Sequence, residues 1–398
     1  MATVVSWVLT GLVGILSIAV AIFALEILAA LTIPRRETRL RTSGVRQQRV
    51  GVLIPAHNEG AGVLPTIGDL QRQLFTGDRL LVVADNCSDD TASVAAAAGA
   101  EVIERHDLSR IGKGYALDFG VRHLSANPPE IVIVIDADCR VEDNAISELA
   151  RSCAHANRPA QALDLMTAPD QSPVNYQIAE FAWRVKNWMR PLGLSALNLP
   201  CQLMGTGMAF PWDVIRSADI ASGDMVEDLK LGLDLAAAGS APVFCPAAVV
   251  RSRFPMSLGG AESQRQRWEH GHIILTLTVV PRFVYLAIAQ RNIGLLALAL
   301  DLAVPPLALL TLILAGAIVV AGVAMLLGGS PAPLIVGVSS MVVLLLCTII
   351  AWAFCAREIL PPHRLVSVVP YALGKIGMYL RLMTRSRVRY WIRTDRRK

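Results

Sequence analysis

The chain has 398 residues, of which 54% are hydrophobic and only 17% are charged. This hydrophobic share is too high for an ordinary soluble domain, so the sequence predicts one globular domain joined to membrane segments. The formal net charge of +5 comes largely from two basic stretches beside apolar segments, which favours contact with an anionic membrane surface and argues against nucleic acid as a partner.

The first predicted element is an apolar stretch from Val4 to Ile33 that contains a single charge, Glu26. Its length exceeds the roughly 20 residues that a helix needs to span a bilayer. The stretch lacks the basic start and the cleavage site of a signal peptide, so we expect residues 1–34 to remain as a transmembrane anchor. Four arginines follow directly, within residues 35–41.

Residues 45–270 then alternate between short apolar runs and segments with helical features. The expected strands are Val50–Ile54, Leu80–Ala84, Glu101–Glu104 and Ile131–Ile135, and the expected helices between them cover residues 59–74, 88–98 and 113–124. Continuous apolar strands separated by helices predict an α/β fold with a mostly parallel sheet. Ligands of such sheets bind beyond the carboxyl ends of the strands, where Asp85 and Asp136 stand.

Two stretches have the composition of helices that lie in the membrane interface. Residues 271–303 are apolar but are interrupted by Pro281 and Asp301. The segment from Tyr176 to Trp188 mixes aromatic residues such as Trp183 with basic residues, which suits the headgroup zone. A core helix with a basic outer face is the alternative for this second stretch.

The last elements are a pair of transmembrane helices within residues 304–356 and a basic interfacial tail over residues 357–398. The tail holds nine Lys or Arg residues against one Asp from Lys375 onwards. An intramembrane carboxylate is a candidate functional group, but Glu26 and Asp301 lie near the ends of their segments, and we expect both to reach toward water.

Basic residues also orient the protein, because short flanks rich in Lys and Arg stay in the cytoplasm. The basic stretches after the first segment and at the end of the chain agree on one topology. The N-terminus is expected outside, and the main domain and C-terminus inside, in a bacterial-type inner or plasma membrane. The seven scattered cysteines contain no Cys-x-x-Cys pair and are expected to be reduced, as on a cytosolic face.

A set of spaced acids ends in a Gln-x-x-Arg-Trp tag. Its members, in order, are Asp85, Asp136-Ala137-Asp138, Glu227-Asp228 and Gln264-x-x-Arg267-Trp268. The order and spacing resemble the membrane-bound family 2 glycosyltransferases, namely the cellulose, chitin and hyaluronan synthases and the ceramide glucosyltransferases. The resemblance covers roughly residues 50–272. It implies a cytoplasmic domain of the Rossmann-like GT-A fold and an enzyme that moves a sugar from a nucleotide donor.

The pair Asp136 and Asp138 predicts a metal site. The diphosphate of a sugar nucleotide carries concentrated negative charge, and a hard divalent cation held by oxygen ligands neutralises it. The resemblance implies that Asp136 contacts the nucleotide and Asp138 the metal, with Mg²⁺ or Mn²⁺ as the candidates. A capped strand end followed by a turn is the alternative, because Asp is a common turn residue.

The resemblance further implies a donor site for a nucleotide sugar, with a UDP-sugar as the expected donor. A planar guanidinium suits phosphate, and a lysine supplies a point charge beside the glycines of its loop. The expected donor-binding residues are Pro55, Glu59, Asp85, Lys113, Asp136, Gln264 and Arg267.

Displacement at the anomeric carbon needs a base that takes the proton of the acceptor hydroxyl. By resemblance Asp228 is the candidate base, with Glu227 beside it, and the reaction inverts the anomeric configuration. The indole of Trp268 suits the apolar face of a pyranose, and Gly205 and Thr206 match the small-residue acceptor loop of the family. We expect His270 and His272 to be structural rather than metal ligands.

The favoured function is transfer of one sugar to a lipid-linked or glycan acceptor at the inner membrane face, for exopolysaccharide, envelope glycan or glycolipid synthesis. The alternative is a processive synthase that extends and exports a β-linked polymer. About three spans are few for one chain to form a polymer channel, although a homo-oligomer would supply more. A nucleotidyltransferase also uses paired carboxylates and a metal, but the Gln-x-x-Arg-Trp tag argues against it.

Overall fold

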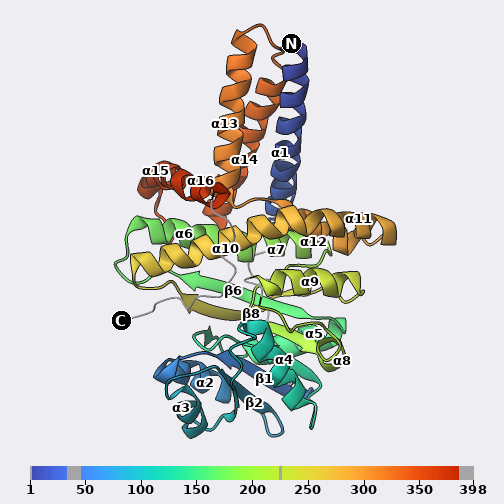
Figure 1. The fold of residues 1–398 in the computed structure, drawn as a ribbon, viewed down its shortest axis with the longest axis vertical. Helices are drawn as coiled ribbons and strands as arrows, with labels where there is room; N and C mark the ends of the chain where they lie inside the picture. The colour runs from blue at the N-terminus through green and yellow to red at the C-terminus, as the bar shows by residue number, and fades with distance from the viewer. Residues whose placement is uncertain (1, 34–45, 224–225, 385–398) are drawn as a thin grey trace.

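The computed structural model describes residues 2–33, 46–223 and 226–384, which fall into three layers (Figure 1). A bundle of three helices stands at one end, a collar of helices lies across its base, and an α/β domain forms the other end. The basic segment 35–41 and the last part of the basic tail, residues 385–398, lie outside the described residues.

The α/β domain is built on one mixed sheet of eight strands in the order β3-β2-β1-β4-β7-β6-β8-β5. Strands β1 to β4 are parallel, β7 is antiparallel to both β4 and β6, β6 and β8 are parallel, and β5 is antiparallel to β8. The strands are β1 (Val50–Ala56), β2 (Arg79–Asp85), β3 (Glu101–Arg105), β4 (Ile131–Val134), β5 (Arg140–Val141), β6 (Ala160–Thr167), β7 (Met208–Pro211) and β8 (Val243–Arg253). The predicted mostly parallel α/β sheet is confirmed.

Helices cover both faces of the sheet, because successive residues of a buried strand point to opposite sides. Val52 and Ile54 join the core beneath α2 (Leu64–Gln71), α3 (Thr91–Ala97) and α5 (Ala145–Ala156). Leu53 joins the opposite core beneath α4 (Lys113–Leu124), α8 (Trp212–Ile215) and α9 (Glu227–Ala237). The helix expected over residues 59–74 is shorter, because a 3-10 turn, η2 (Gly60–Val63), precedes α2 and the positive φ of Gly60 interrupts a helix there.

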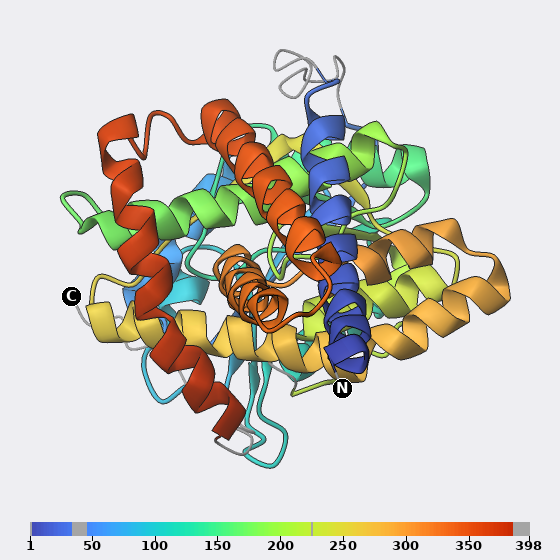
Figure 2. The same cartoon turned by 90° about the horizontal axis from the view of Figure 1, so that it is seen from above.

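The collar surrounds the base of the bundle when the molecule is seen from above (Figure 2). Helices α10 and α11 meet at a bend of 47°. Tyr371 accepts a hydrogen bond from Arg265, and Lys375 pairs with Glu269, so the C-terminal helices are fixed to α10. The collar consists of α6 (Val174–Arg184), the π-helical turn η3 (Val185–Met189), α7 (Arg190–Ala196), α10 (Leu258–Thr278), α11 (Val280–Gln290), α12 (Ile293–Ala303), η4 (Pro362–Ser367), α15 (Val368–Gly374) and α16 (Ile376–Thr384).

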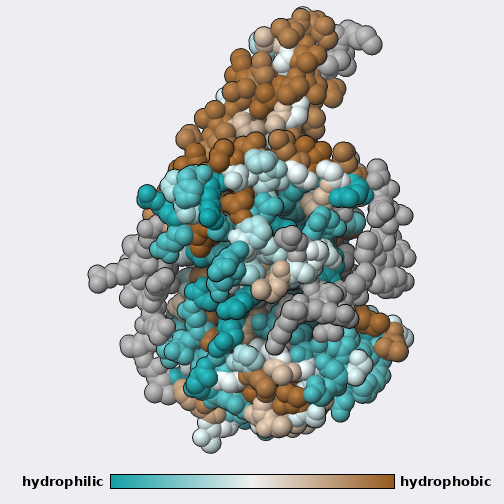
Figure 3. Space-filling view, turned by 90° about the vertical axis from the view of Figure 1, so that its left-hand side faces the viewer, coloured by the Kyte–Doolittle hydropathy of each residue, from teal (hydrophilic) through white to brown (hydrophobic). Residues whose placement is uncertain are grey.

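The bundle consists of α1 (Ala2–Ala30), α13 (Leu307–Leu326) and α14 (Ala332–Cys355), and within the described residues these three helices are long and apolar enough to cross a membrane. Large apolar side chains such as Ile15, Val319 and Ile335 point outward and are exposed. Figure 3 shows this apolar surface continuing onto the collar, whereas the α/β domain is mostly hydrophilic. An exposed apolar surface of this kind suits lipid contact.

A buried ion cluster joins the bundle to the collar. Arg190 of α7 places Nε 2.5 Å from Glu26 Oε2 of α1 and Nη2 2.6 Å from Asp301 Oδ1 of α12. The Nε2 of Gln202 donates to Asp301 Oδ2 over 2.9 Å. Helices α1 and α7 cross so closely that a Cβ at Gly193 would lie 1.8 Å from the Glu26 carbonyl oxygen, so only glycine fits at this position.

The expectation that Glu26 and Asp301 reach toward water is therefore wrong. Their exposed fractions are only 1% and 7%, and one guanidinium pairs with both carboxylates. The expectation that the basic residues around Trp183 face headgroups is also wrong for two of them. Arg190 binds the two acids, and Arg184 binds Glu180 and the Cys355 carbonyl.

Arg190→Met should destabilise the protein strongly, because it leaves two buried carboxylates facing each other without a cation. Removing one partner of a buried ion cluster costs about 3–5 kcal/mol. The loss should be measured as a lower unfolding temperature of the detergent-solubilised protein. Arg216→Met is the matched control, because Arg216 and Asp213 form an exposed pair, and such pairs contribute about 0–1 kcal/mol. Equal unfolding temperatures for both variants would contradict a structural role for the cluster.

Candidate active site

A cavity of about 340 Å³ opens beyond the carboxyl ends of the parallel strands β1, β2 and β4. Every residue that the sequence singled out for donor, metal, base or acceptor contacts lines it. These residues are Pro55, Glu59, Asp85, Lys113, Asp136, Asp138, Gly205, Thr206, Glu227, Asp228, Gln264, Arg267 and Trp268. The fold thus brings together side chains from seven separate segments of the chain, and their individual roles stay predictions.

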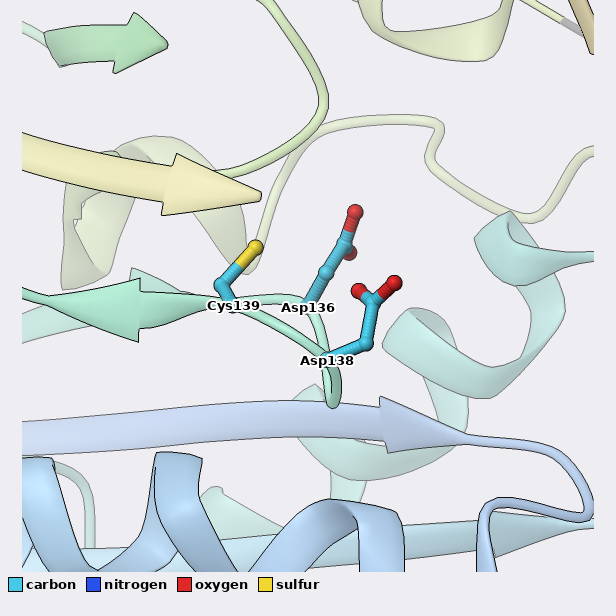
Figure 4. A group of neighbouring side chains, drawn as sticks. All are labelled: Asp136, Asp138 and Cys139. Atoms are coloured by element: carbon cyan, nitrogen blue, oxygen red, sulfur yellow. The ribbon is translucent and has the colours of Figure 1, made fainter. Parts of the chain in front are cut away.

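The Asp136 loop leaves the sheet directly after β4. The ligand atoms of Asp136, Asp138 and Cys139 lie within 4.8 Å of one another, and both carboxylates point away from the sheet (Figure 4). The backbone N–H of Asp136 donates to Thr206 Oγ1 over 3.0 Å, which fixes the loop. Burial raises the pKa of the Cys139 thiol far above its ordinary value, so it stays protonated. The two carboxylates are therefore the hard oxygen ligands on offer.

Lys113 begins α4 and joins three parts of the site. Its ammonium pairs with the Asp136 carboxylate and donates to the Gly205 carbonyl over 2.8 Å. Burial alone would lower the pKa of Lys113, but the charges of Asp136 and Glu227 outweigh burial and raise that pKa. The ammonium is therefore permanently charged at neutral pH.

Close backbone packing explains why glycines stand on both sides of Lys113. A Cβ at Gly114 would lie 2.4 Å from the Ile220 carbonyl oxygen, and a Cβ at Gly112 would lie 2.7 Å from Gly223 Cα. The φ of Gly112 is +148°, which also favours glycine. The loop is thus close-packed against the chain's own segment 220–223, and close approach to a phosphate is not needed to explain these glycines.

The far end of the cavity is formed by β1, β2 and the turns that follow them. Asp85, at the end of β2, is 7% exposed, and its Oδ1 lies 2.6 Å from Arg105 Nη1. The ring Nδ1 of His57 forms a 2.7 Å hydrogen bond with the Asp85 carbonyl. The backbone N–H of Glu59 donates to Thr91 Oγ1 over 2.9 Å. These contacts hold the predicted nucleoside end of the site in place.

Glu227 and Asp228 occupy the first turn of α9, where the helix dipole favours negative charge. Burial raises the pKa of Asp228 above its ordinary value, although the charges of Lys186 and Lys113 oppose this. Burial and the adjacent charge of Asp228 raise the pKa of Glu227 to about 7. A Cβ at Gly205 would lie 3.4 Å from Asp228 Oδ2, so the loop of Gly205 and Thr206 lies beside the acidic pair.

The Gln-x-x-Arg-Trp tag lies within helix α10 rather than in a loop. Its spacing of three and four residues places Gln264, Arg267 and Trp268 on one face of the helix, and all three line the cavity. The Trp268 ring lies 4.9 Å from the ring of Trp183, centroid to centroid. The ring Nε2 of His272 forms a 3.2 Å hydrogen bond with the Val304 carbonyl, and His272 also lines the cavity.

The cavity lining also includes residues that the sequence did not single out for the site, among them Asp164, Lys186 and Asn187. Asp164 interrupts the apolar strand β6, and a carboxylate inside such a strand could have marked it as a candidate functional residue. Lys186 and Asn187 lie in the π-helical turn η3, whose orientation no sequence pattern reveals. Burial, and then the charge of Asp136, raise the pKa of Asp164 to about 7. Burial lowers the pKa of Lys186.

Comparison with solved structures shows the fold. A mannosyltransferase from Pyrobaculum calidifontis, PcManGT, solved with GDP-mannose and Mn²⁺, superposes with a TM-score of 0.51 at 18% identity. The match covers 93% of this chain and 99% of that protein, so both the GT-A domain and the overall arrangement are shared. The GT-A fold expected from the sequence is confirmed.

Two curated relatives match this chain over only part of their length. A probable glycosyltransferase of Bacillus subtilis, YdaM, is 23% identical over 275 residues, which are 64% of this chain and 62% of that protein. An N-acetylglucosaminyltransferase of Rhizobium leguminosarum bv. viciae is 24% identical over 270 residues, 63% of each protein. The matched region thus spans less than two thirds of either relative.

The sequence model described as "Glycosyltransferase like family 2" matches residues 47–271. This region holds the sheet, the Asp136 loop, the acidic pair and the tag, and it makes up more than half of the 398 residues. The chain therefore belongs to the family 2 glycosyltransferases.

Proposed function

We propose that the protein transfers one sugar from a nucleoside-diphosphate sugar, with a UDP-sugar as the expected donor, to a lipid-linked acceptor at the inner membrane face. The transfer inverts the anomeric centre and forms a β linkage, in the synthesis of an exopolysaccharide, an envelope glycan or a glycolipid. The observation that carries this proposal is one cavity lined by the Asp136–Asp138 pair, by Lys113 and by Asp228.

The donor half of the cavity has the charges that a diphosphate requires. Asp138 and Asp136 fit a hard divalent cation, Mg²⁺ or Mn²⁺, because both offer oxygen ligands on the same side of one loop. Such a cation neutralises the diphosphate and stabilises the departing nucleotide. Lys113 and Arg267 supply permanent positive charge on two other walls of the cavity. Pro55, Glu59, Asp85 and Gln264 then contact the rest of the donor.

The acceptor half is organised around Asp228. Its carboxylate takes the proton of the acceptor hydroxyl while that oxygen attacks the anomeric carbon and the bond to the diphosphate breaks. Glu227 has its pKa raised to about 7 and acts as a second acid beside the base. Gly205 and Thr206 line the acceptor side, and the Thr206 hydroxyl already accepts from Asp136. Trp268 supplies an apolar wall for the acceptor.

A processive synthase is the alternative. A growing polysaccharide is polar along its length and crosses a bilayer only through a lined path. The described spanning helices pack against one another through buried apolar residues such as Leu314, Leu344 and Cys347, which favours short products. The size of the product formed by protein shown to be monomeric separates the two functions.

Transfer from labelled nucleotide sugars by the protein in nanodiscs should require Mg²⁺ or Mn²⁺. Excess chelator should abolish transfer, and added metal should restore it, because the diphosphate is otherwise left against two carboxylates. Asp138→Asn should raise the metal concentration needed for half-maximal rate by tenfold or more. Asp143→Asn is the matched control, since Asp143 is exposed five residues further on. Full activity in chelator would rule out the proposed metal.

Asp228→Asn keeps the size of the side chain but removes the proton acceptor, so the transfer rate should fall about 10²–10⁴-fold. Only the carboxylate form is active, and burial raises its pKa. Activity should therefore be complete above that raised pKa and decline as the pH falls through it, above the ordinary value of about 4. Asp234→Asn, in a half-exposed pair with Lys230 on the same helix, is the control. Near-parental turnover of folded Asp228→Asn would move the base to Glu227.

Alkaline phosphatase fusions should test the orientation, because this enzyme is active only outside the cytoplasm. A fusion at the C-terminus should be inactive if the basic tail stays inside. A fusion in the turn between α13 and α14, at Gly329, should be active, since this turn lies at the outer end of the bundle beside the start of α1. The opposite pattern would invert the proposed topology.

A further inference from the structure

An exposed apolar stripe runs along the last helices of the described chain. We call η4, α15 and α16, residues 362–384, the C-terminal strap, and only Lys375 separates α15 from α16. Four large apolar side chains recur along the strap at intervals of three or four residues, which places them on one side of a helix. Their exposed fractions range from 41% to 76%, and they are Val366, Val369, Leu373 and Ile376.

The opposite side of the strap packs on the protein. Leu365, Val368 and Tyr371 pack against the core cluster that also contains buried residues of the bundle. Further along, Met378 is only 7% exposed. The strap therefore has one packed side and one exposed apolar side, which is the pattern of a helix that lies in the plane of a membrane surface.

The strap lies at the level where the bundle meets the collar, because it follows the spanning helix α14 directly after residues 356–361. Figure 1 shows α15 and α16 beside the base of the bundle, and Figure 2 shows them crossing α6 and α10 on the side that faces the bundle. The apolar surface of the bundle also extends onto the collar in Figure 3. This continuity points to lipid as the partner of the exposed stripe.

Basic residues accompany the stripe. Residues 376–398 contain eight Lys or Arg residues and one Asp, and Arg364 is exposed at the start of the strap. An amphipathic segment of this kind binds anionic lipids more strongly than neutral lipids, because apolar burial and charge attraction add. The cytoplasmic leaflet, where the proposed orientation puts the strap, carries anionic lipids. The charge therefore favours an anionic lipid surface.

The packed side of the strap also holds α10, the helix that carries the Gln-x-x-Arg-Trp tag. Arg265 Nη1 donates to the Tyr371 hydroxyl over 3.3 Å. Lys375 pairs with Glu269, and both side chains are largely buried, at 15% and 13% exposed. Arg265 and Glu269 lie one turn apart on α10, about a third of a turn around the helix from the tag residues. Any displacement of the strap would therefore be passed to the tag.

We infer that the C-terminal strap docks on a membrane surface that carries anionic lipids, and that this docking holds α10 where Arg267 of the tag meets the donor. The docking itself does not depend on the proposed function, whereas its effect on donor binding rests on that function. The membrane surface thus positions part of the donor site in addition to anchoring the protein, and donor affinity depends on the composition of the lipid.

Docking is tested by fluorescence quenching of the full chain in nanodiscs of phosphatidylcholine and phosphatidylglycerol. A fluorophore is attached to Leu373→Cys in a Cys87→Ser background, because the other native cysteines are buried. A quencher carried on the lipid near its headgroup should lower the emission about twofold or more, since an interfacial stripe lies at that depth. Leu108→Cys is the matched control, because Leu108 is an apolar residue of the α/β domain that is 80% exposed, and its label should keep its emission.

Two outcomes would overturn the docking. The first is a label at position 373 that the lipid-borne quencher does not affect. The second is self-quenching between labelled copies of the chain in place of quenching by lipid, which would assign the stripe to a contact between two copies.

The effect on the donor site is tested by calorimetry of UDP or GDP binding in the presence of Mn²⁺. The Kd should be about threefold to tenfold lower in nanodiscs that contain phosphatidylglycerol than in nanodiscs of phosphatidylcholine alone. Val369→Glu combined with Leu373→Glu should abolish this preference, because anionic lipid repels an acidic stripe. Leu108→Glu is the matched control and should retain the preference. Equal affinity of the parent protein in both kinds of nanodisc would overturn the effect on the donor site.

Lys375→Met separates docking from its transmission, because it removes the contact of the strap with Glu269 and leaves the apolar stripe intact. The nucleotide Kd should rise about tenfold while the label at position 373 remains quenched by lipid. Tyr371→Phe, which removes only the hydroxyl bound by Arg265, should act in the same direction and serves if Lys375→Met does not fold. Parental nucleotide affinity in both folded variants would overturn the transmission. If no nucleoside diphosphate binds the parent protein, the proposed function fails, and the quenching at position 373 decides the docking on its own.

Discussion

The arrangement of the whole molecule depends on one buried guanidinium. Arg190 holds Glu26 of the first bundle helix and Asp301 of the collar at the same time, and Gln202 completes the cluster from the loop before β7. Separating buried charges of opposite sign is strongly unfavourable, so the cluster tolerates few relative positions of the helices that supply it. The close crossing at Gly193 has the same effect. Together they fix the angle at which the membrane bundle meets the sugar-transfer domain.

The same helical segment also forms a wall of the active site. From Trp183 to Arg190, inward-facing polar or aromatic residues recur every three or four positions, and the π-helical turn η3 lies between them. Lys186 and Asn187 face the cavity, and Arg190 faces the bundle. A small space lined by Lys186, Asn187, Arg190, His272 and Asp301 separates the two groups. π-helical turns are frequent at functional sites, where they redirect a few side chains without ending the helix.

The sequence was most informative where local chemistry determines structure. The helix predicted over residues 113–124 is α4, Lys113–Leu124, and the strands around Asp85 and Asp136 follow their apolar runs. All predicted site residues line one cavity. Asp85 and Asp136 meet there because the carboxyl ends of parallel strands share an edge, and α9 and α10 bring the acidic pair and the tag to the same edge. The failures concern long-range pairing. Glu26 and Arg190 are 164 residues apart, and no local pattern reveals that one neutralises the other. Aromatic and basic residues around Trp183 suggested headgroup contact, whereas several of them turn inward.

Residues that could be recognised from the sequence differ physically from those that could not. Donor binding requires metal ligands and cations of fixed type, so Asp136, Asp138 and Lys113 are recognisable by residue identity and spacing. The contact of Asp164 with Asn187 is not recognisable in this way, because it is a property of the folded packing. The strand β6 supplies Asp164, and the collar helix anchored by Arg190 supplies Asn187, so the distance between the two is fixed by the contact of the sugar-transfer domain with the membrane bundle. The position of this pair in the cavity therefore depends on how the collar packs against the α/β domain, whereas Asp85 and Asp136 are placed by the sheet itself, at the ends of β2 and β4.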